Sequence, residues 1–288
     1  MTAPGGIVWL ASFPKSGNTW FRIFLANLAA AENEPADINH LDEPGAIASN
    51  RYQFESVTLL DSGLLAHDVI ECLRPRVYEQ VAAEETGRRW VKVHDAYTMT
   101  SQGEPLLGRG VACAAIYLVR DPRDVAVSLS FHNNTTIDEA IKAMDAGDNA
   151  LCRSRKGMPL QLLQKLNTWS GHVASWLDQR DVPVLTVRYE DLVADPVAGF
   201  GAALRFAAQD AAPEEIERSV RHADFTELQR QESERGFGER VSKQGPFFRT
   251  GRAGGWRDQL SADQIARIED AHGATMRRLG YALSEACG

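Results

Sequence analysis

The chain has few cysteines, and their spacing excludes the sites that cysteine pairs commonly build. Cys72, Cys113, Cys152 and Cys287 are far apart among 288 residues and form no Cys-x-x-Cys pair, so they indicate neither a disulfide framework nor a zinc site. This usage is typical of a reducing compartment. No stretch approaches the roughly 20 apolar residues of a spanning helix, and no basic segment precedes the first, strand-length apolar run. The sequence therefore predicts a cytoplasmic protein without a membrane partner.

Positive charge is also scarce. Lys and Arg number 31 against 39 Asp and Glu, for a net charge of −8, which argues against nucleic acid or an anionic membrane as a partner. An anionic ligand would need a local basic cluster, and no set of metal ligands stands out. Repeats, low-complexity tracts and long Pro/Gly/Ser linkers are absent too. With 44% apolar and 24% charged residues, the chain is predicted to form a single domain over residues 1–288.

Strand-like and helical patterns alternate along the chain. The predicted strands cover residues 7–12, 90–94, 111–119 and 182–187, and the predicted helices cover residues 18–31, 124–131, 166–179, 196–208, 213–222 and 261–279. Residues 32–65, 133–164 and 232–255 show no sustained period. This alternation predicts an α/β fold, a three-layer α/β/α arrangement with a mostly parallel central sheet. Polar clusters follow the strands, at residues 15–19, 92–94, 120–123 and 188–191, where such sheets bind ligands.

The turn after the first strand has the composition of an anion-binding loop. A helix start presents backbone N–H groups without partners and carries partial positive charge, so a lysine and small polar residues there favour an anion. The loop is P-loop-like, yet the familiar Gly-x-x-x-x-Gly-Lys-[Ser/Thr] spacing is missing: Lys15 precedes Gly17 by two residues. Taken alone, the loop is about as compatible with a strand–turn–helix junction whose lysine merely faces solvent as it is with an anion-binding site.

Four ordered motifs resemble those of the sulfotransferases that use 3′-phosphoadenosine 5′-phosphosulfate (PAPS). They are PKSGNTW at residues 14–20, KVH at 92–94, IYLVRDPRDVAVS at 116–128 and FRTGRAGGW at 248–256. They resemble, in order, the family's 5′-phosphosulfate loop, its Lys-x-His strand end, its 3′-phosphate segment and its C-terminal Arg-Lys-Gly-x-x-Gly-x-Trp motif. The resemblance extends from residue 7 to about residue 264.

The resemblance implies PAPS as co-substrate, 3′-phosphoadenosine 5′-phosphate (PAP) as product, and no metal. The residues implied to bind the nucleotide are Lys15, Ser16, Gly17, Asn18, Thr19, Trp20, Arg120, Ser128, Tyr189, Phe225, Arg249, Thr250 and Gly251. The loop would hold the 5′-phosphosulfate, Arg120 with Ser128 and Arg249 the 3′-phosphate, and three aromatic side chains the adenine. For Arg120 the alternative is a salt bridge with Asp121 or Asp124, and for the aromatic residues it is core packing. Arg123 is expected at the surface.

This chain departs from the family pattern at three positions. Asn18 replaces the usual threonine of the loop, and Thr250 replaces a lysine, which removes one positive charge from the 3′-phosphate side. Arg252 or Arg257 would compensate, and the sequence does not distinguish them. Ala223 stands where the family has a hydroxyl residue two places before the aromatic, so one phosphate contact would be missing.

The resemblance also implies the catalytic residues His94, Lys15 and Lys92. An imidazole near its unperturbed pKa suits a general base that takes a proton from an acceptor hydroxyl, while Lys92 would stabilise the transferring sulfuryl oxygens. The acceptor is predicted to be a small hydrophobic or aromatic hydroxyl compound. Six aromatic residues are candidates for its pocket: Phe13, Phe54, Tyr97, Phe131, Phe237 and Phe247.

Two other functions remain compatible with the sequence. One is a small-molecule kinase with a divergent phosphate loop, which would need ATP and magnesium. The other is a non-catalytic module that binds PAPS, although such a module has no use for a base. The oligomeric state is open, with a homodimer as one possibility.

Overall fold

A parallel sheet lies at the centre of the protein. The computed structural model describes residues 6–41, 46–154, 159–241 and 245–284, and in these ranges the sheet has the strand order β2-β1-β3-β6. Its strands are β1 (Gly6–Ser12), β2 (Arg88–Val93), β3 (Ala112–Val119) and β6 (Val184–Arg188). All three pairings between neighbours are parallel. Two short strands, β4 (Ala150–Leu151) and β5 (Gln164–Lys165), pair antiparallel away from this sheet.

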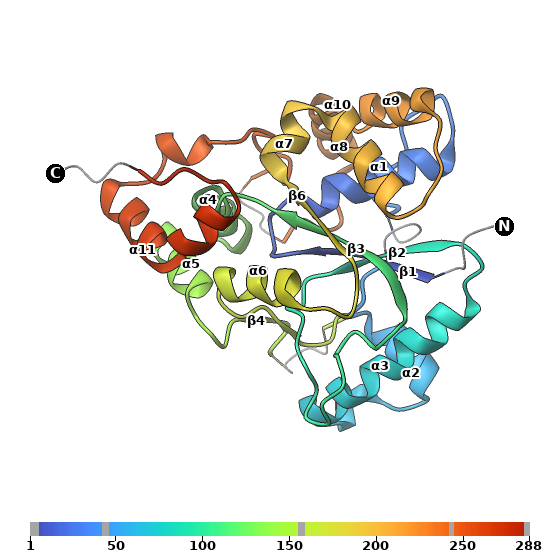
Figure 1. Cartoon of the computed structure of the whole chain (residues 1–288). Coiled ribbons are helices and arrows are strands. Elements are labelled where there is room, and N and C mark those ends of the chain that lie inside the picture. Colours follow the sequence, from blue (N-terminus) through green and yellow to red (C-terminus); the bar gives the residue numbers. More distant parts are fainter. Residues whose placement is uncertain (1–5, 42–45, 155–158, 242–244, 285–288) are drawn as a thin grey trace.

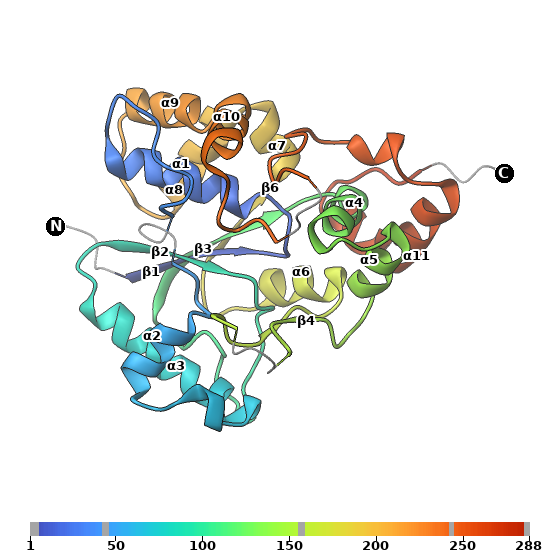
Figure 2. The ribbon, with the colours of Figure 1, turned by 180° about the vertical axis from the view of Figure 1, so that it is seen from behind.

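Helices cover both faces of the sheet and complete three layers (Figures 1 and 2). One layer consists of α1 (Asn18–Ala30), α7 (Tyr189–Ala194), α8 (Pro196–Phe206), α9 (Pro213–His222) and α10 (Phe225–Arg235). The other contains α2 (Arg51–Thr58), α3 (His67–Glu84), α4 (Pro122–Asn133), α5 (Ile137–Met144), α6 (Trp169–Asp178) and α11 (Ala262–Arg278). Two 3₁₀ turns, η1 (Ser62–Leu64) and η2 (Gly255–Asp258), complete the elements. The predicted three-layer fold is confirmed.

Strand β1 explains why the sheet has two cores. Successive side chains of a strand point to opposite faces, so Ile7 and Trp9 pack with α3 and α6 whereas Val8 and Leu10 pack with α1 and α8. Every residue of β1 is buried, which matches the continuous apolar run of a strand covered on both faces.

The structure adds helices in segments of the sequence that have no sustained hydrophobic period. Residues 32–65 contain α2 and η1, residues 133–164 contain α5, and α10 extends into residues 232–255. The long helix α3 lies in a stretch for which no element was predicted. Cys287 is outside the described residues. Among those described, no helix is long and apolar enough to cross a membrane, and no three His, Cys, Asp or Glu residues gather as a metal site.

The four polar clusters all follow strands of the parallel sheet. Because these strands run in one direction, their carboxyl ends meet at the same edge. The loop after β1, the residues after β2, the start of α4 after β3 and the start of α7 after β6 therefore lie together. This edge positions the candidate site.

Candidate active site

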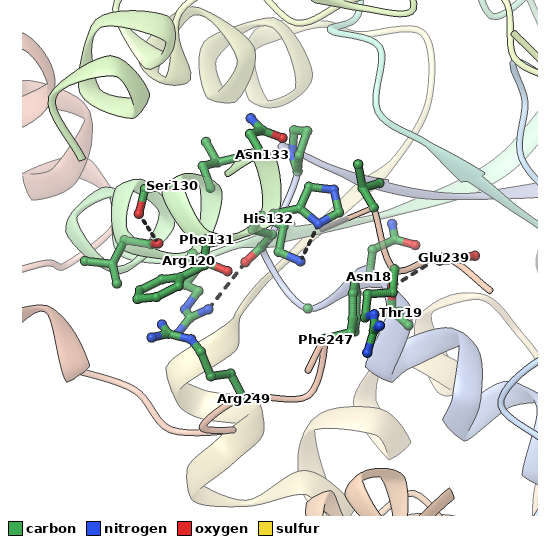
Figure 3. A pocket seen from close by; sticks show the side chains of 18 of the residues that line it. Asn18, Thr19, Arg120, Ser130, Phe131, His132, Asn133, Glu239, Phe247 and Arg249 are labelled. Carbon is green, nitrogen blue, oxygen red and sulfur yellow. Dashed lines mark hydrogen bonds between the residues drawn. The ribbon is translucent and has the colours of Figure 1, made fainter. Parts of the chain in front are cut away.

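One large cavity opens at the carboxyl edge of the sheet. Its volume is about 1210 Å³, above the roughly 300–1,000 Å³ of a site for one small ligand. Its lining includes the predicted residues Lys15, Gly17, Asn18, Thr19, Trp20, Lys92, His94, Arg120, Ser128, Tyr189, Phe225, Arg249, Thr250 and Gly251. Figure 3 shows Arg120 and Arg249 on one side of His132, and Thr19 and Glu239 on the other. The structure thus brings the predicted residues to one cavity except Ser16, which is fully buried and is not part of the lining.

The loop between β1 and α1 forms the first group of anion-binding atoms. Gly17, at φ 100°, precedes α1, and a Cβ there would lie 2.8 Å from the ring of Tyr189, so the turn requires glycine. Ser16 is fully buried and its Oγ has no hydrogen-bond partner. A buried hydroxyl without a partner is costly, so this atom is suited to a ligand oxygen. Asn18 differs: its Nδ2 donates to the carbonyl of Leu10 at 2.9 Å, which leaves the backbone N–H as its group at the helix start.

Lys15 is held among cations and aromatic groups. Its Nζ lies 4.0 Å above the ring of Phe247 and 3.5 Å from His132 Nδ1. Burial, followed by the charges of Arg120 and Lys92, lowers the pKa of Lys15 to about 7. A cation destabilised in this way gains from a bound anion, because the anion removes the repulsion.

Arg120 and Arg249 form the second cationic group. Arg120 follows β3, stacks 4.4 Å above the ring of Tyr189 and donates to the carbonyl of Arg252 at 3.1 Å. Its Nε is buried without a partner. The alternative salt bridge exists only with Asp124, at 3.8 Å. The guanidinium of Arg249 lies 3.6 Å above the ring of Phe131, and burial and Arg120 lower its pKa.

Arg123 is buried, which corrects the expectation of a surface position. Its side chain is 4% exposed and pairs with Asp121 at 2.6 Å and with Glu269 of α11 at 2.7 Å. It also stacks 4.0 Å from the ring of Trp256. Two carboxylates and an indole provide the partners that a buried guanidinium needs, so Arg123 joins α4 to α11 instead of facing solvent.

Asp124 connects the two segments that carry the second cationic group, Arg120 and Arg249. Its carboxylate, 3% exposed, accepts from the backbone N–H of Gly254 at 2.7 Å and of Trp256 at 2.9 Å, and it lies beside Arg120. One carboxylate on α4 therefore places the segment that carries Arg249 against the segment that carries Arg120.

Replacing Asp124 should weaken nucleotide binding. Asp124→Asn keeps the shape but removes the charge and one acceptor, so we expect the Kd of PAP to rise about tenfold, since a hydrogen bond to a charged group contributes ~1.5–3 kcal/mol. Calorimetric titration with PAP measures this change. Asp138→Asn, an exposed acid of α5 that pairs with Arg267, is the control. Unchanged affinity in Asp124→Asn would contradict the role of this carboxylate.

Three aromatic residues line the cavity together with the two cationic groups. Trp20 donates from Nε1 to the carbonyl of Ala223 at 2.9 Å and meets Tyr189 edge-on at 6.1 Å between ring centroids. The ring of Phe225, at the start of α10, would lie 2.4 Å from a Cβ at Gly251, so glycine permits its close approach to the C-terminal motif. All three rings line the cavity, where an aromatic face can stack on a flat group.

The structure distinguishes the two arginines, Arg252 and Arg257, that were candidates to replace the positive charge missing at Thr250. Thr250 is exposed and lines the cavity. Arg252 lines it as well, with its guanidinium 2.9 Å from Asp258, whereas Arg257 stacks on Trp256 and is not part of the lining. Of the two candidates for the missing charge, only Arg252 reaches the cavity.

His94 lies just beyond the end of β2 and lines the cavity. Its Nδ1 is 2.8 Å from the carbonyl oxygen of Ser12, and because a carbonyl only accepts, Nδ1 carries the proton. The lone pair of Nε2 is then available to accept a proton. Burial, and next the charge of Lys92, lower the pKa of His94 to about 3, so the ring is neutral at neutral pH.

Glu239 is a site residue that the sequence did not reveal. Its carboxylate lies 2.5 Å from Arg22, 3.5 Å from Lys92 and 3.4 Å from Thr19 Oγ1. Although burial raises its pKa, Lys92 and Arg22 lower it to about 2, so Glu239 is ionised. Glu239, itself held by Arg22, fixes the ammonium of Lys92 beside the loop. No local signal marks Glu239, because it lies in a stretch without periodicity.

Part of the predicted aromatic pocket is wrong. Phe13, Phe131 and Phe247 line the cavity, but Phe54, Tyr97 and Phe237 do not. Phe54 packs in the core beneath α2, and the Tyr97 hydroxyl donates to Asp181 at 2.9 Å. Phe237 instead supports the cavity wall by packing against Phe247 with tilted rings, 4.8 Å between ring centroids.

Comparisons with known proteins agree with this geometry. The sulfotransferase domain family matches residues 6–280. Cytosolic sulfotransferase 17 of Arabidopsis thaliana is 22% identical over 96% of this chain and 76% of its own length, and luciferin sulfotransferase of Photinus pyralis is 22% identical over 91% and 69%.

Two solved structures are similar in fold. Retinol dehydratase in complex with androsterone and PAP has a TM-score of 0.63 and 21% identity, covering 97% of this chain and 82% of that one. Mouse sulfotransferase SULT7A1 complexed with PAP has a TM-score of 0.60 and 21% identity, covering 96% and 86%. Because the family match spans almost the whole sequence, the chain belongs to the sulfotransferase family, the PAPS-dependent enzymes that its four motifs resemble.

Proposed function

We propose that this sulfotransferase moves the sulfuryl group of PAPS to a hydroxyl of a small, apolar or aromatic acceptor, with His94 as general base. The observation that carries the proposal is the single cavity lined by Lys15, by Arg120 with Arg249, and by His94. Two cationic groups suit the two ends of one nucleotide, and the volume of the cavity leaves space for an acceptor as well.

The residues present fit the nucleotide. Two buried polar atoms without partners, Ser16 Oγ and Arg120 Nε, belong to the two cationic groups, where phosphate oxygens would satisfy them. Trp20, Tyr189 and Phe225 line the same cavity, and their rings suit adenine. PAPS would supply an activated sulfuryl group bonded to a phosphate that leaves as PAP.

The chemical roles of His94, Lys15 and Lys92 follow from their protonation states and positions. His94 holds its proton at Nδ1 against Ser12, so Nε2 takes the proton of the acceptor hydroxyl. Lys15 stabilises the negative charge that develops on the departing phosphate, and Lys92, held by Glu239, stabilises the sulfuryl oxygens. Fixed cations at these positions lower the barrier because they need no rearrangement during the transfer.

The acceptor side of the cavity supports an apolar skeleton with a hydroxyl group. Leu160 and Val241 are exposed apolar side chains that line the cavity from two separate segments. Exposed apolar side chains gathered at a site favour an apolar ligand. A structural neighbour, retinol dehydratase, is solved with retinol and with androsterone, two compounds of this kind.

A binding and turnover experiment tests the proposal. We expect PAP to bind with micromolar or tighter affinity in the presence of EDTA, and ATP with magnesium to bind at least about tenfold more weakly, since it has no 3′-phosphate for Arg120 and Arg249. Incubation with PAPS and a panel of phenols and apolar alcohols should give a sulfate adduct by mass spectrometry. Tighter binding of ATP with magnesium, together with phosphorylated products, would favour a kinase. PAP binding without any sulfated product would favour a binding module.

A further inference from the structure

The peptide groups that carry the proposed base are held by side chains of helix α6. The carbonyls of His94 and Asp95 lie beyond the end of β2. His172 Nε2 is 3.0 Å from the carbonyl oxygen of His94, and Trp176 Nε1 donates to that of Asp95 at 3.0 Å. His172 and Trp176 are four residues apart and so share one face of α6. Both are fully buried, and neither lines the cavity.

The hydrogen bonds fix the tautomer of His172. A carbonyl oxygen only accepts, so Nε2 of His172 carries the proton and Nδ1 must accept. The partner of Nδ1 is the hydroxyl of Tyr117 at 2.8 Å, which therefore donates. A directed chain runs from Tyr117 in β3 through His172 to the main chain of His94. Burial lowers the pKa of His172 to about 4, so the ring stays neutral and the chain keeps this direction at neutral pH.

Two further contacts complete the support of this short segment. The Asp95 carboxylate pairs with Arg74 of α3 through contacts of 3.0 Å and 2.6 Å, and both side chains are 1% exposed. The ring of His94 is held from β1 by Ser12. Residues 94 and 95 are thus anchored from β1, α3 and α6, an arrangement that exceeds what a strand end needs for pairing alone.

We propose that His172 is a positioning residue for sulfuryl transfer: by donating to the carbonyl of His94, it sets the angle at which the base presents Nε2 to the acceptor. The inference rests on the proposed function. A displacement of about 1 Å at a reacting group can lower a rate ~100-fold, so a hydrogen bond outside the cavity can control turnover.

The test compares two replacements of His172. His172→Phe keeps a ring against Phe13, which packs edge-on at 5.5 Å, but it leaves the His94 carbonyl and the Tyr117 hydroxyl without their partner. We expect kcat to fall about 10- to 100-fold, while the Kd of PAP changes less than twofold. His172→Gln retains a side-chain N–H donor and should recover most of the rate. His272→Phe is the matched control, since His272 is also buried and hydrogen-bonded, to Ser170, but makes no hydrogen bond with residues 94 or 95.

The readout distinguishes positioning from general loss of stability. Turnover is measured with PAPS and 2-naphthol, and also as release of inorganic sulfate from PAPS in water, where water replaces the acceptor. In a His94→Ala background, His172→Phe should cause no further loss, because the residue acts through the base. If His172→Phe unfolds the protein, Tyr117→Phe removes the far donor with little change of shape and should lower kcat more modestly without changing PAP affinity.

Three results would overturn the inference. They are a wild-type kcat in His172→Phe, an equal loss of rate in the His94→Ala background, and a parallel loss of PAP affinity. Failure of the proposed function has a different signature, because His94→Ala itself would then retain wild-type turnover.

Discussion

His94→Ala should lower kcat at least about 100-fold and leave the Kd of PAP within about threefold of the wild-type value. The expected loss follows from the contribution of a positioned general base, ~100- to 10,000-fold. PAP affinity should survive because the nucleotide contacts are assigned to the loop after β1, to Arg120 and Arg249, and to the three aromatic residues Trp20, Tyr189 and Phe225. Steady-state kinetics with an acceptor found in the screen, and calorimetry with PAP, measure the two quantities.

A second histidine makes this experiment discriminating. His132 also lines the cavity, with its Nδ1 near Lys15, and burial and Lys15 lower its pKa to about 4. It is the alternative base. We expect His132→Ala to lose much less activity than His94→Ala. The reverse order of effects would move the base to α4 and contradict the assignment.

The pH dependence of kcat/KM also tests whether His94 is the general base. In the free protein the pKa of His94 is about 3, so its imidazole is already deprotonated at pH 5. The acid limb of kcat/KM should therefore lack a break near 6.5, the value of an unperturbed histidine. Bound phosphosulfate adds negative charge near the ring, which raises the pKa of His94 and makes it a stronger base for the transfer step.

Lys15→Ala should have the second large effect, with kcat lowered ~100- to 1,000-fold, as for other groups that stabilise developing negative charge. PAP affinity should fall as well, because the lysine contacts the 5′-phosphate in the proposed complex. Lys142→Ala, an exposed lysine on α5, is the control and should match the wild type. Wild-type turnover in Lys15→Ala would remove the loop from the mechanism.

The lowered pKa of Lys15 leads us to expect proton uptake when the nucleotide binds. In the free protein its pKa is about 7, so at pH 8 most molecules carry a neutral amine. A bound phosphate favours the ammonium form and raises this pKa, so binding at pH 8 should take up close to one proton, and PAP affinity should fall as pH rises above 7. At pH 6 the amine is already protonated and its uptake should vanish. Calorimetry in buffers of different ionisation enthalpy measures this number. Uptake at pH 8 that persists in Lys15→Ala would assign it to another group.

Local sequence was sufficient for the strands, the loop and the helix that follows it. Apolar runs bounded by polar turns marked β1 and β3, and each residue assigned at a strand end lies at the carboxyl edge of the sheet. The helices that the sequence did not predict have weak local signals. Pro75 lies inside α3 and resembles a helix breaker, and α10 is so polar that few apolar positions mark its buried face.

Long-range pairing explains what else escaped prediction. Glu239 is separated from Lys92 by well over a hundred residues, and His172 from His94 by 78, so no spacing rule connects them. The burial of Arg123 depends on Glu269 of the last helix, which comes near only in the folded chain. Such contacts arise from topology, whereas the motifs that predicted the nucleotide residues are contiguous in sequence.

The central claim is that two cationic groups hold one nucleotide across the carboxyl edge of the sheet and direct its reactive end toward His94. A crystal structure with PAP tests it most directly. We predict the 5′-phosphate within hydrogen-bond distance of Lys15 and the N–H groups of residues 16–19, the adenine between Trp20 and Phe225, and the 3′-phosphate against Arg120, Ser128 and Arg249. A nucleotide bound elsewhere, or one that reaches only one of the two cationic groups, would contradict the account.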